Sequence, residues 1–156
     1  MKIVAMTGDK ETSLKAWFKK LSTPSQIFGG MPPCPFAKSA LLKNKVEVID
    51  YVDFPQIVGY MAKKWNKEVV IFVMQDQSAV WITDLAEKCN RVYPEFLFLE
   101  EHPDLVEKVG GLHLNSGLVL LLVQKRNELE EARDELKKTD YYDKWTNELK
   151  ERIFNR

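Results

Sequence analysis

The side chain best suited to chemistry in this sequence is Cys34. It follows Pro32 and Pro33, which disfavour a helix at their positions, and it precedes Pro35, which suits the first helical position. The pattern therefore predicts Cys34 at or next to the N-cap of a helix that ends near Asn44. Free backbone N–H groups and the positive end of the helix dipole favour a thiolate there, so we expect a lowered pKa for Cys34.

His102 is the histidine best placed to act together with Cys34. It follows an apolar strand expected at 96–99, and α/β folds place ligands beyond the carboxyl ends of their strands. A histidine beside a cysteine at a helix cap favours the ion pair that makes a thiol nucleophilic. The sequence thus predicts a catalytic group of Cys34, His102 and Asp104, in which Asp104 orients the imidazole.

Four further polar residues are candidates for binding a ligand. Lys38 lies one turn into the predicted Cys34 helix, where its charge would add to the positive end of the dipole. A glycine-containing loop over 105–116 could close over the site. Three candidates lie in that loop: His113, Asn115 and Ser116.

Two other interpretations of the same side chains stay open. In the first, Cys34 is a small buried residue that closes a loop, and His102 packs or caps at a strand end. In the second, a zinc ion is bound, because the ligand types are those that zinc prefers. That set would contain Cys34, His102, His113 and either Asp104 or Glu101. Its spacing is not diagnostic, so we predict no metal site, and no cofactor is identified.

The composition limits the classes of protein to which this chain can belong. The chain has 156 residues, 45% of them apolar, which suits one domain over 1–156 with a core of its own. The 23 acidic and 23 basic residues cancel, which argues against a nucleic-acid-binding protein. No apolar run approaches the ~20 residues that span a bilayer, so no membrane association is predicted. A small molecule is the expected partner, and a homo-oligomer stays open.

The cysteines and the N-terminus indicate a compartment. Cys34 and Cys89 are far apart and form no CxxC pair, and the apolar stretch at 1–6 is too short for a signal peptide. We therefore expect a reduced, cytoplasmic setting.

Alternating helix and strand patterns predict the fold class. An amphipathic helix is expected at 9–21, a half-exposed edge strand at 46–49, and strands covered on both faces at 69–73, 96–99 and 118–123. The last strand follows a loop and is expected to be antiparallel. The prediction is a single layered α/β domain with an about four-stranded mixed sheet and helices on both faces.

Two further helices are predicted from their apolar and aromatic spacing. One follows Ser78 and places four residues on a buried stripe: Trp81, Leu85, Cys89 and Val92. The other begins at Thr139 or Asp140 and carries Tyr141, Tyr142 and Trp145. On this pattern Cys89 is a core residue.

The motif Cys34-Pro35-Phe36-Ala37 supports two resemblances. It is similar to the Cys-Pro-aromatic helix start of glutaredoxins and omega-class glutathione transferases. A longer stretch resembles a bacterial domain-of-unknown-function family that has a Leu-Cys-Pro-Phe-Ala motif and a strand ending in Phe-His-Pro. The corresponding segments here are 34–38, 46–49, 69–73, 84–87 and 98–104. This resemblance implies that Cys34 and His102 are shared reactive side chains, and it implies no activity.

The sequence therefore predicts a small cytoplasmic α/β protein with a Cys34–His102 centre that binds or acts on a small molecule. The alternative is a non-catalytic ligand-binding or protein-interaction module in which Cys34 is structural. Whether the protein is an enzyme is left open.

Overall fold

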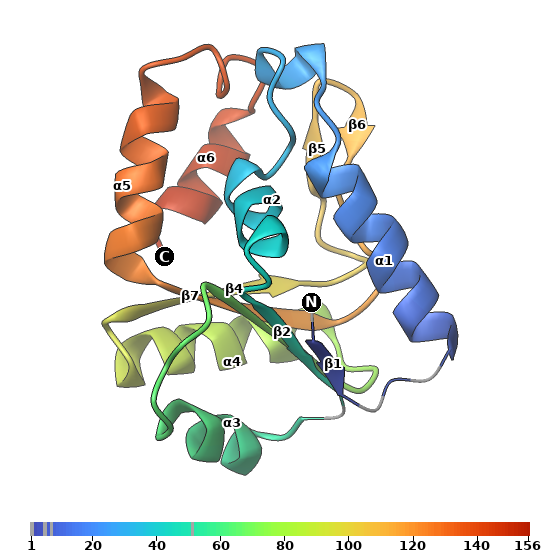
Figure 1. The fold of residues 1–156 in the computed structure, drawn as a ribbon, viewed down its shortest axis with the longest axis vertical. Coiled ribbons are helices and arrows are strands. Elements are labelled where there is room, and N and C mark those ends of the chain that lie inside the picture. The colour runs from blue at the N-terminus through green and yellow to red at the C-terminus, as the bar shows by residue number, and fades with distance from the viewer. Residues whose placement is uncertain (1, 5, 7, 51) are drawn as a thin grey trace.

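A five-stranded sheet forms the centre of the fold (Figure 1). The computed structural model describes residues 2–4, 6, 8–50 and 52–156. In spatial order the strands are β1 (Lys2–Val4), β2 (Val46–Ile49), β3 (Val69–Val73), β7 (Leu120–Lys125) and β4 (Phe96–Glu101). The first three are parallel, and β7 runs antiparallel to both of its neighbours. The predicted α/β fold with a mixed sheet is confirmed.

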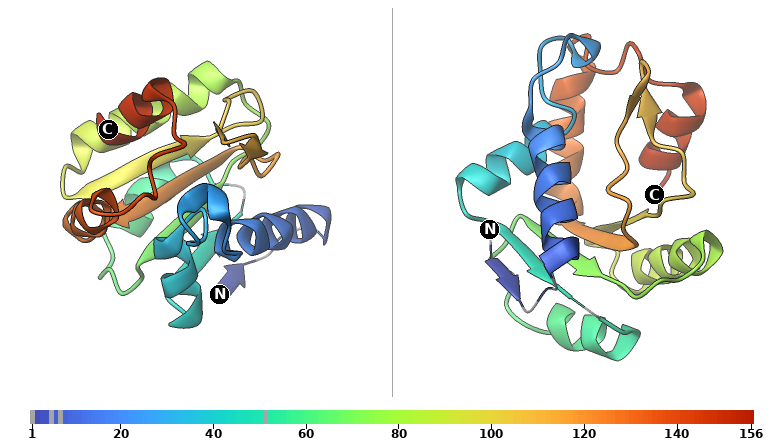
Figure 2. Two further views of the ribbon diagram at one scale, coloured as in Figure 1. Left: turned by 90° about the horizontal axis from the view of Figure 1, so that it is seen from above. Right: turned by 90° about the vertical axis from the view of Figure 1, so that its right-hand side faces the viewer.

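Helices cover both faces of this sheet (Figures 1 and 2). One face carries α3 (Phe54–Met61) and α4 (Ala79–Val92). The other carries α1 (Gly8–Ser22), α2 (Pro35–Leu42), α5 (Arg126–Lys137) and α6 (Asn147–Phe154). A short 3-10 helix (Gln26–Phe28) lies between α1 and α2. Along the chain, β4 and β7 are joined by a segment that contains a small hairpin of β5 (Lys108–Val109) and β6 (Leu112–His113).

Side chains of β3 point alternately to the two faces, as the period of two in a strand requires. Ile71 belongs to the buried cluster that contains Leu14 of α1. Phe72 belongs to the opposite cluster, with Ile57 of α3 and Ile82 of α4. All five residues of β3 are buried, in agreement with the predicted central strand.

Two strand predictions need correction. The strand at 46–49 was expected at a sheet edge, but β2 lies between β1 and β3. The reason is β1, a three-residue strand that the sequence patterns did not reveal. The strand expected at 118–123 is β7 and begins at Leu120.

Two helix predictions also need correction. In α4 the buried stripe contains Ile82, Leu85 and Cys89, whereas Trp81 and Val92 are exposed. Cys89 is nevertheless fully buried, as predicted for a core residue. The last helix begins only at Asn147, so the aromatic residues at 141–145 lie in turns that precede α6.

Candidate ligand-binding site

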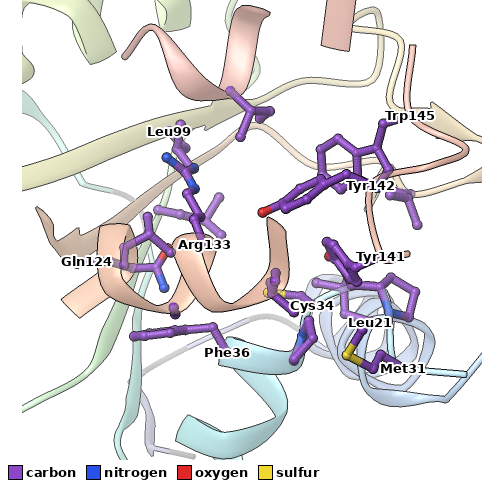
Figure 3. A pocket seen from close by; sticks show the side chains of 18 of the residues that line it. Leu21, Met31, Cys34, Phe36, Leu99, Gln124, Arg133, Tyr141, Tyr142 and Trp145 are labelled. Atoms are coloured by element: carbon purple, nitrogen blue, oxygen red, sulfur yellow. The ribbon is translucent and has the colours of Figure 1, made fainter. Parts of the chain in front are cut away.

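A cavity of about 660 Å³ lies between the sheet and the helices of the α1 face (Figure 3). Leu122 and Gln124 of β7 and Leu99 of β4 form its sheet side. Most of the remaining lining is apolar or aromatic: Trp17, Leu21, Met31, Phe36, Leu114, Leu129, Leu136, Tyr141, Tyr142, Trp145 and Ile153. The volume lies within the range of about 300–1,000 Å³ that is common for small-molecule sites.

Cys34 lies in the wall of this cavity, at the predicted N-cap of α2. Its sulfur accepts a hydrogen bond from the backbone N–H of Ala37, with 3.4 Å between Sγ and N. Its own backbone N–H donates to the carbonyl of Leu21 at the end of α1, at 3.0 Å. The hydroxyl of Tyr141 donates to the carbonyl of Pro33. These contacts fix the thiol at the junction of α1, α2 and the aromatic turn.

The predicted lowering of the Cys34 pKa is wrong. Burial raises the pKa of this thiol, because a thiolate there would lose its hydration. The Ala37 N–H and the charge of Arg133 act in the opposite direction, and their effect is smaller. Cys34 is therefore a largely protonated thiol at neutral pH.

His102 does not line the cavity, and its two ring nitrogens have partners elsewhere. Nε2 lies 2.7 Å from the carbonyl oxygen of Gln77, and Nδ1 accepts a hydrogen bond from the backbone N–H of Asp104 at 3.0 Å. Because Nδ1 accepts, Nε2 carries the proton and donates to Gln77. Gln77 lies directly before the N-cap of α4, and α4 covers the face of the sheet opposite to α2. The structure thus does not bring His102 to Cys34.

The other predicted site residues form a network at the end of β4. Asn115 Nδ2 donates to the carbonyls of His102 and Leu105, at 3.1 and 2.6 Å. Ser116 bonds to Glu101 through both its backbone N–H and its hydroxyl. Asp104 is exposed, with Oδ2 3.7 Å from Nδ1 of His102. These contacts hold a loop in place.

Lys38 and His113 are not part of the cavity lining. His113 is exposed, and its carbonyl accepts a hydrogen bond from Nζ of Lys20 at 2.8 Å. Lys38 lies on α2 beside a shallow surface hollow. Of the seven residues predicted from the sequence, the cavity lining contains only Cys34.

Sequence reasoning missed several polar residues of the lining, among them Gln124, Arg133 and Tyr142. Figure 3 shows Arg133 reaching from α5 into the region between Gln124, Leu99 and Tyr142. A signal for Arg133 was present, because it lies at helical spacing between Leu129 and Leu136, on the inward stripe of α5. A charged residue within an apolar stripe indicates either a buried partner or a binding site.

The described part of the chain contains neither a group of metal ligands nor a membrane-spanning helix. No group of three or more histidine, cysteine or carboxylate side chains there is positioned to hold a metal ion. None of the helices over the same residues has both the length and the apolar composition to cross a membrane.

The fold and the cavity together define a class: a mixed-sheet α/β protein with a largely apolar cavity beside its sheet. Comparison with known protein families, with curated proteins and with solved structures finds no match. The resemblance of the Cys34 segment to a bacterial family of unknown function therefore stays a prediction.

Proposed function

We propose that this protein binds a small, largely apolar molecule in the cavity beside Cys34. The observation that carries the proposal is the cavity itself, which combines the volume of a ligand site with a lining of leucine and aromatic side chains. The opposite face of the sheet is filled by side chains such as Phe72, Phe98 and Ile82, all fully buried. An apolar cavity beside a sheet whose other face is filled by these side chains is better explained by a ligand than by poor packing throughout the core.

Within this proposal Cys34 contacts the ligand as part of the wall. The raised pKa and the local partners of His102 give no support to a nucleophilic Cys34–His102 pair. The proposal therefore corresponds to the non-catalytic ligand-binding alternative. No reaction is assigned.

A neutral fluorescent probe, 1-aminoanthracene, tests the proposal. Its emission should rise in a saturable manner on addition of the protein, because it enters an apolar site. Ala132 lies in the cavity wall on α5, so Ala132→Phe should fill part of the space and weaken binding by about tenfold or more. The matched control is Ala62→Phe at the exposed end of α3, which should leave the affinity unchanged.

A second measurement does not depend on a substitution. Bound 1-aminoanthracene should slow the reaction of Cys34 with N-ethylmaleimide, because the thiol lines the same space. Absence of saturable binding by the unaltered protein would overturn the proposal. Equal affinities for the folded Ala132→Phe and Ala62→Phe variants would do the same.

A further inference from the structure

The acidic side chains of the cavity wall have their own cationic partners. Glu107 pairs with Arg152 of α6, Glu100 with Arg156, and Glu135 with Lys138. Burial raises the pKa of Glu107, while Arg152 beside it acts in the opposite direction. Each of these three carboxylates is thus already paired with its own cationic side chain, and none of them is paired with Arg133.

Glu101 is the remaining acid of the lining, and it is almost fully buried. Burial raises the pKa of Glu101 to about 8, although the N–H and hydroxyl of Ser116 act in the opposite direction. At neutral pH this side chain is mostly a neutral carboxylic acid.

Arg133 is the one cation of the lining, and none of the described carboxylates forms an ion pair with it. Burial lowers the pKa of Arg133, which means that its charge has lost part of its hydration. The nearby Glu130 lies one turn earlier on α5 and approaches Arg126 instead, at 3.9 Å between Oε1 and Nη1. The guanidinium of Arg133 lies over the ring of Phe154, 5.6 Å from its centroid, and feels the charge of Glu130, but it has no carboxylate within ion-pair distance among the described residues.

Several neutral polar groups of the lining make no hydrogen bond to the described residues, and one of them, Trp145 Nε1, is fully enclosed. Gln124 is only 7% exposed, yet its side-chain amide makes no hydrogen bond to them. The Tyr142 hydroxyl makes none either, and burial raises the pKa of Tyr142 to about 12, so that it keeps its proton. Figure 3 shows Tyr142 and Gln124 on either side of Arg133. Unlike Trp145 Nε1, the Gln124 amide and the Tyr142 hydroxyl are not fully enclosed, so both present polar atoms to the open space of the cavity.

We infer that the cavity binds a small carboxylic acid with an apolar body. Its carboxylate pairs with the guanidinium of Arg133 and accepts hydrogen bonds from Tyr142 and Gln124. The apolar body lies against the leucine side chains of the sheet and of α5, Leu99, Leu122 and Leu136. This inference rests on the proposed function and adds the charge of the ligand to it. A carboxylate in this position gives Arg133 the close ion pair that it lacks and accepts hydrogen bonds from polar atoms that already open into the cavity.

Three ligands of equal chain length separate charge from apolarity: decanoate, decanol and decylamine. Each is used below its micelle concentration to displace 1-aminoanthracene. Decanoate should displace the probe at about tenfold lower concentration than decanol, and decylamine should be the weakest. Arg133→Met keeps the apolar stem and removes the charge, so decanoate and decanol should then compete equally. The control Arg91→Met alters an exposed arginine of α4 and should retain the preference for decanoate.

The outcomes separate this inference from the proposed function. Equal competition by decanoate and decanol in the unaltered protein would overturn the carboxylate and leave the apolar site standing. An unchanged preference in Arg133→Met would overturn the role of Arg133. Failure of 1-aminoanthracene itself to bind would overturn the proposed function and this inference together. If decanol displaces 1-aminoanthracene from Arg133→Met at the same concentration as from the unaltered protein, the variant is folded and its cavity is intact.

Discussion

At Cys34 two electrostatic effects act in opposite directions on one sulfur atom. The helix N-terminus offers the N–H of Ala37 at 3.4 Å, which favours the thiolate. The surrounding apolar side chains remove water, which favours the thiol, and this effect is the larger of the two. A position at a helix N-cap therefore does not by itself make a reactive cysteine.

The reactivity of Cys34 should reflect its raised pKa. Its alkylation by iodoacetamide should be slow at neutral pH and should rise with pH to a midpoint above the ordinary thiol value of about 8.5. Peptide mass spectrometry of samples quenched at a series of pH values measures the rate at this residue. Cys34→Ala reports any background from Cys89, whose pKa burial raises to about 11. A midpoint well below 8.5 would contradict the raised pKa and would revive the nucleophile hypothesis.

Glu101 should make the stability of the protein depend on pH. Its folded-state pKa is about 8, above the ordinary value of 4.5, so the folded chain holds a proton that the unfolded chain releases. The free energy of unfolding should therefore fall as the pH rises from about 4.5 to about 8, and should level off above that range. Over this window the loss is on the order of a few kcal/mol, measurable by urea unfolding.

The variant Glu101→Gln isolates this contribution. Its amide oxygen can accept from the N–H of Ser116, and its NH2 takes the place of the oxygen that accepts from the Ser116 hydroxyl, which can donate to the carbonyl of Leu118 instead. At pH 5 the two proteins should be about equally stable, whereas at pH 8 the variant should be the more stable one. An identical pH dependence in both proteins would show that Glu101 ionises normally.

At the scale of elements, the predictions that held depend on local chemistry. The thiol of Cys34 caps α2, as predicted. The amphipathic period placed α1 within one residue at each end. Strand β1 was missed because three residues carry too short a pattern, and its pairing with β2 is set by the rest of the sheet.

The candidate site was harder to predict than the elements, because it depends on which face each side chain takes. Cys34 was placed correctly at a helix cap, but the side to which His102 points depends on how β4 ends, with Glu101 facing the cavity. Tyr142 belongs to turns that the sequence patterns assigned to a helix. The contacts that define the cavity join residues far apart in the chain, such as Tyr141 and Pro33, and no local pattern encodes them.

At the scale of the whole molecule, the two faces of the sheet are packed differently. The face under α3 and α4 is filled by buried side chains, whereas the face under α1, α2 and α5 leaves the cavity. Leu121 and Leu122 are neighbours on β7 and point to opposite faces: Leu121 is fully buried in the filled cluster, and Leu122 lines the cavity. Truncating each of these two leucines therefore measures how the packing of the two faces differs.

Leu121→Ala should lower the free energy of unfolding by about 3–5 kcal/mol, because it opens a hole in a filled core. Leu122→Ala should cost less than about 2 kcal/mol, because its side chain already borders empty space and loses fewer contacts. Urea unfolding of both variants measures the two losses. Leu122→Ala should also change the affinity for 1-aminoanthracene, whereas Leu121→Ala should not, because only Leu122 borders the cavity. Equal losses of stability would mean that the cavity is filled by side chains in solution, and an unchanged affinity in Leu122→Ala would place the probe elsewhere.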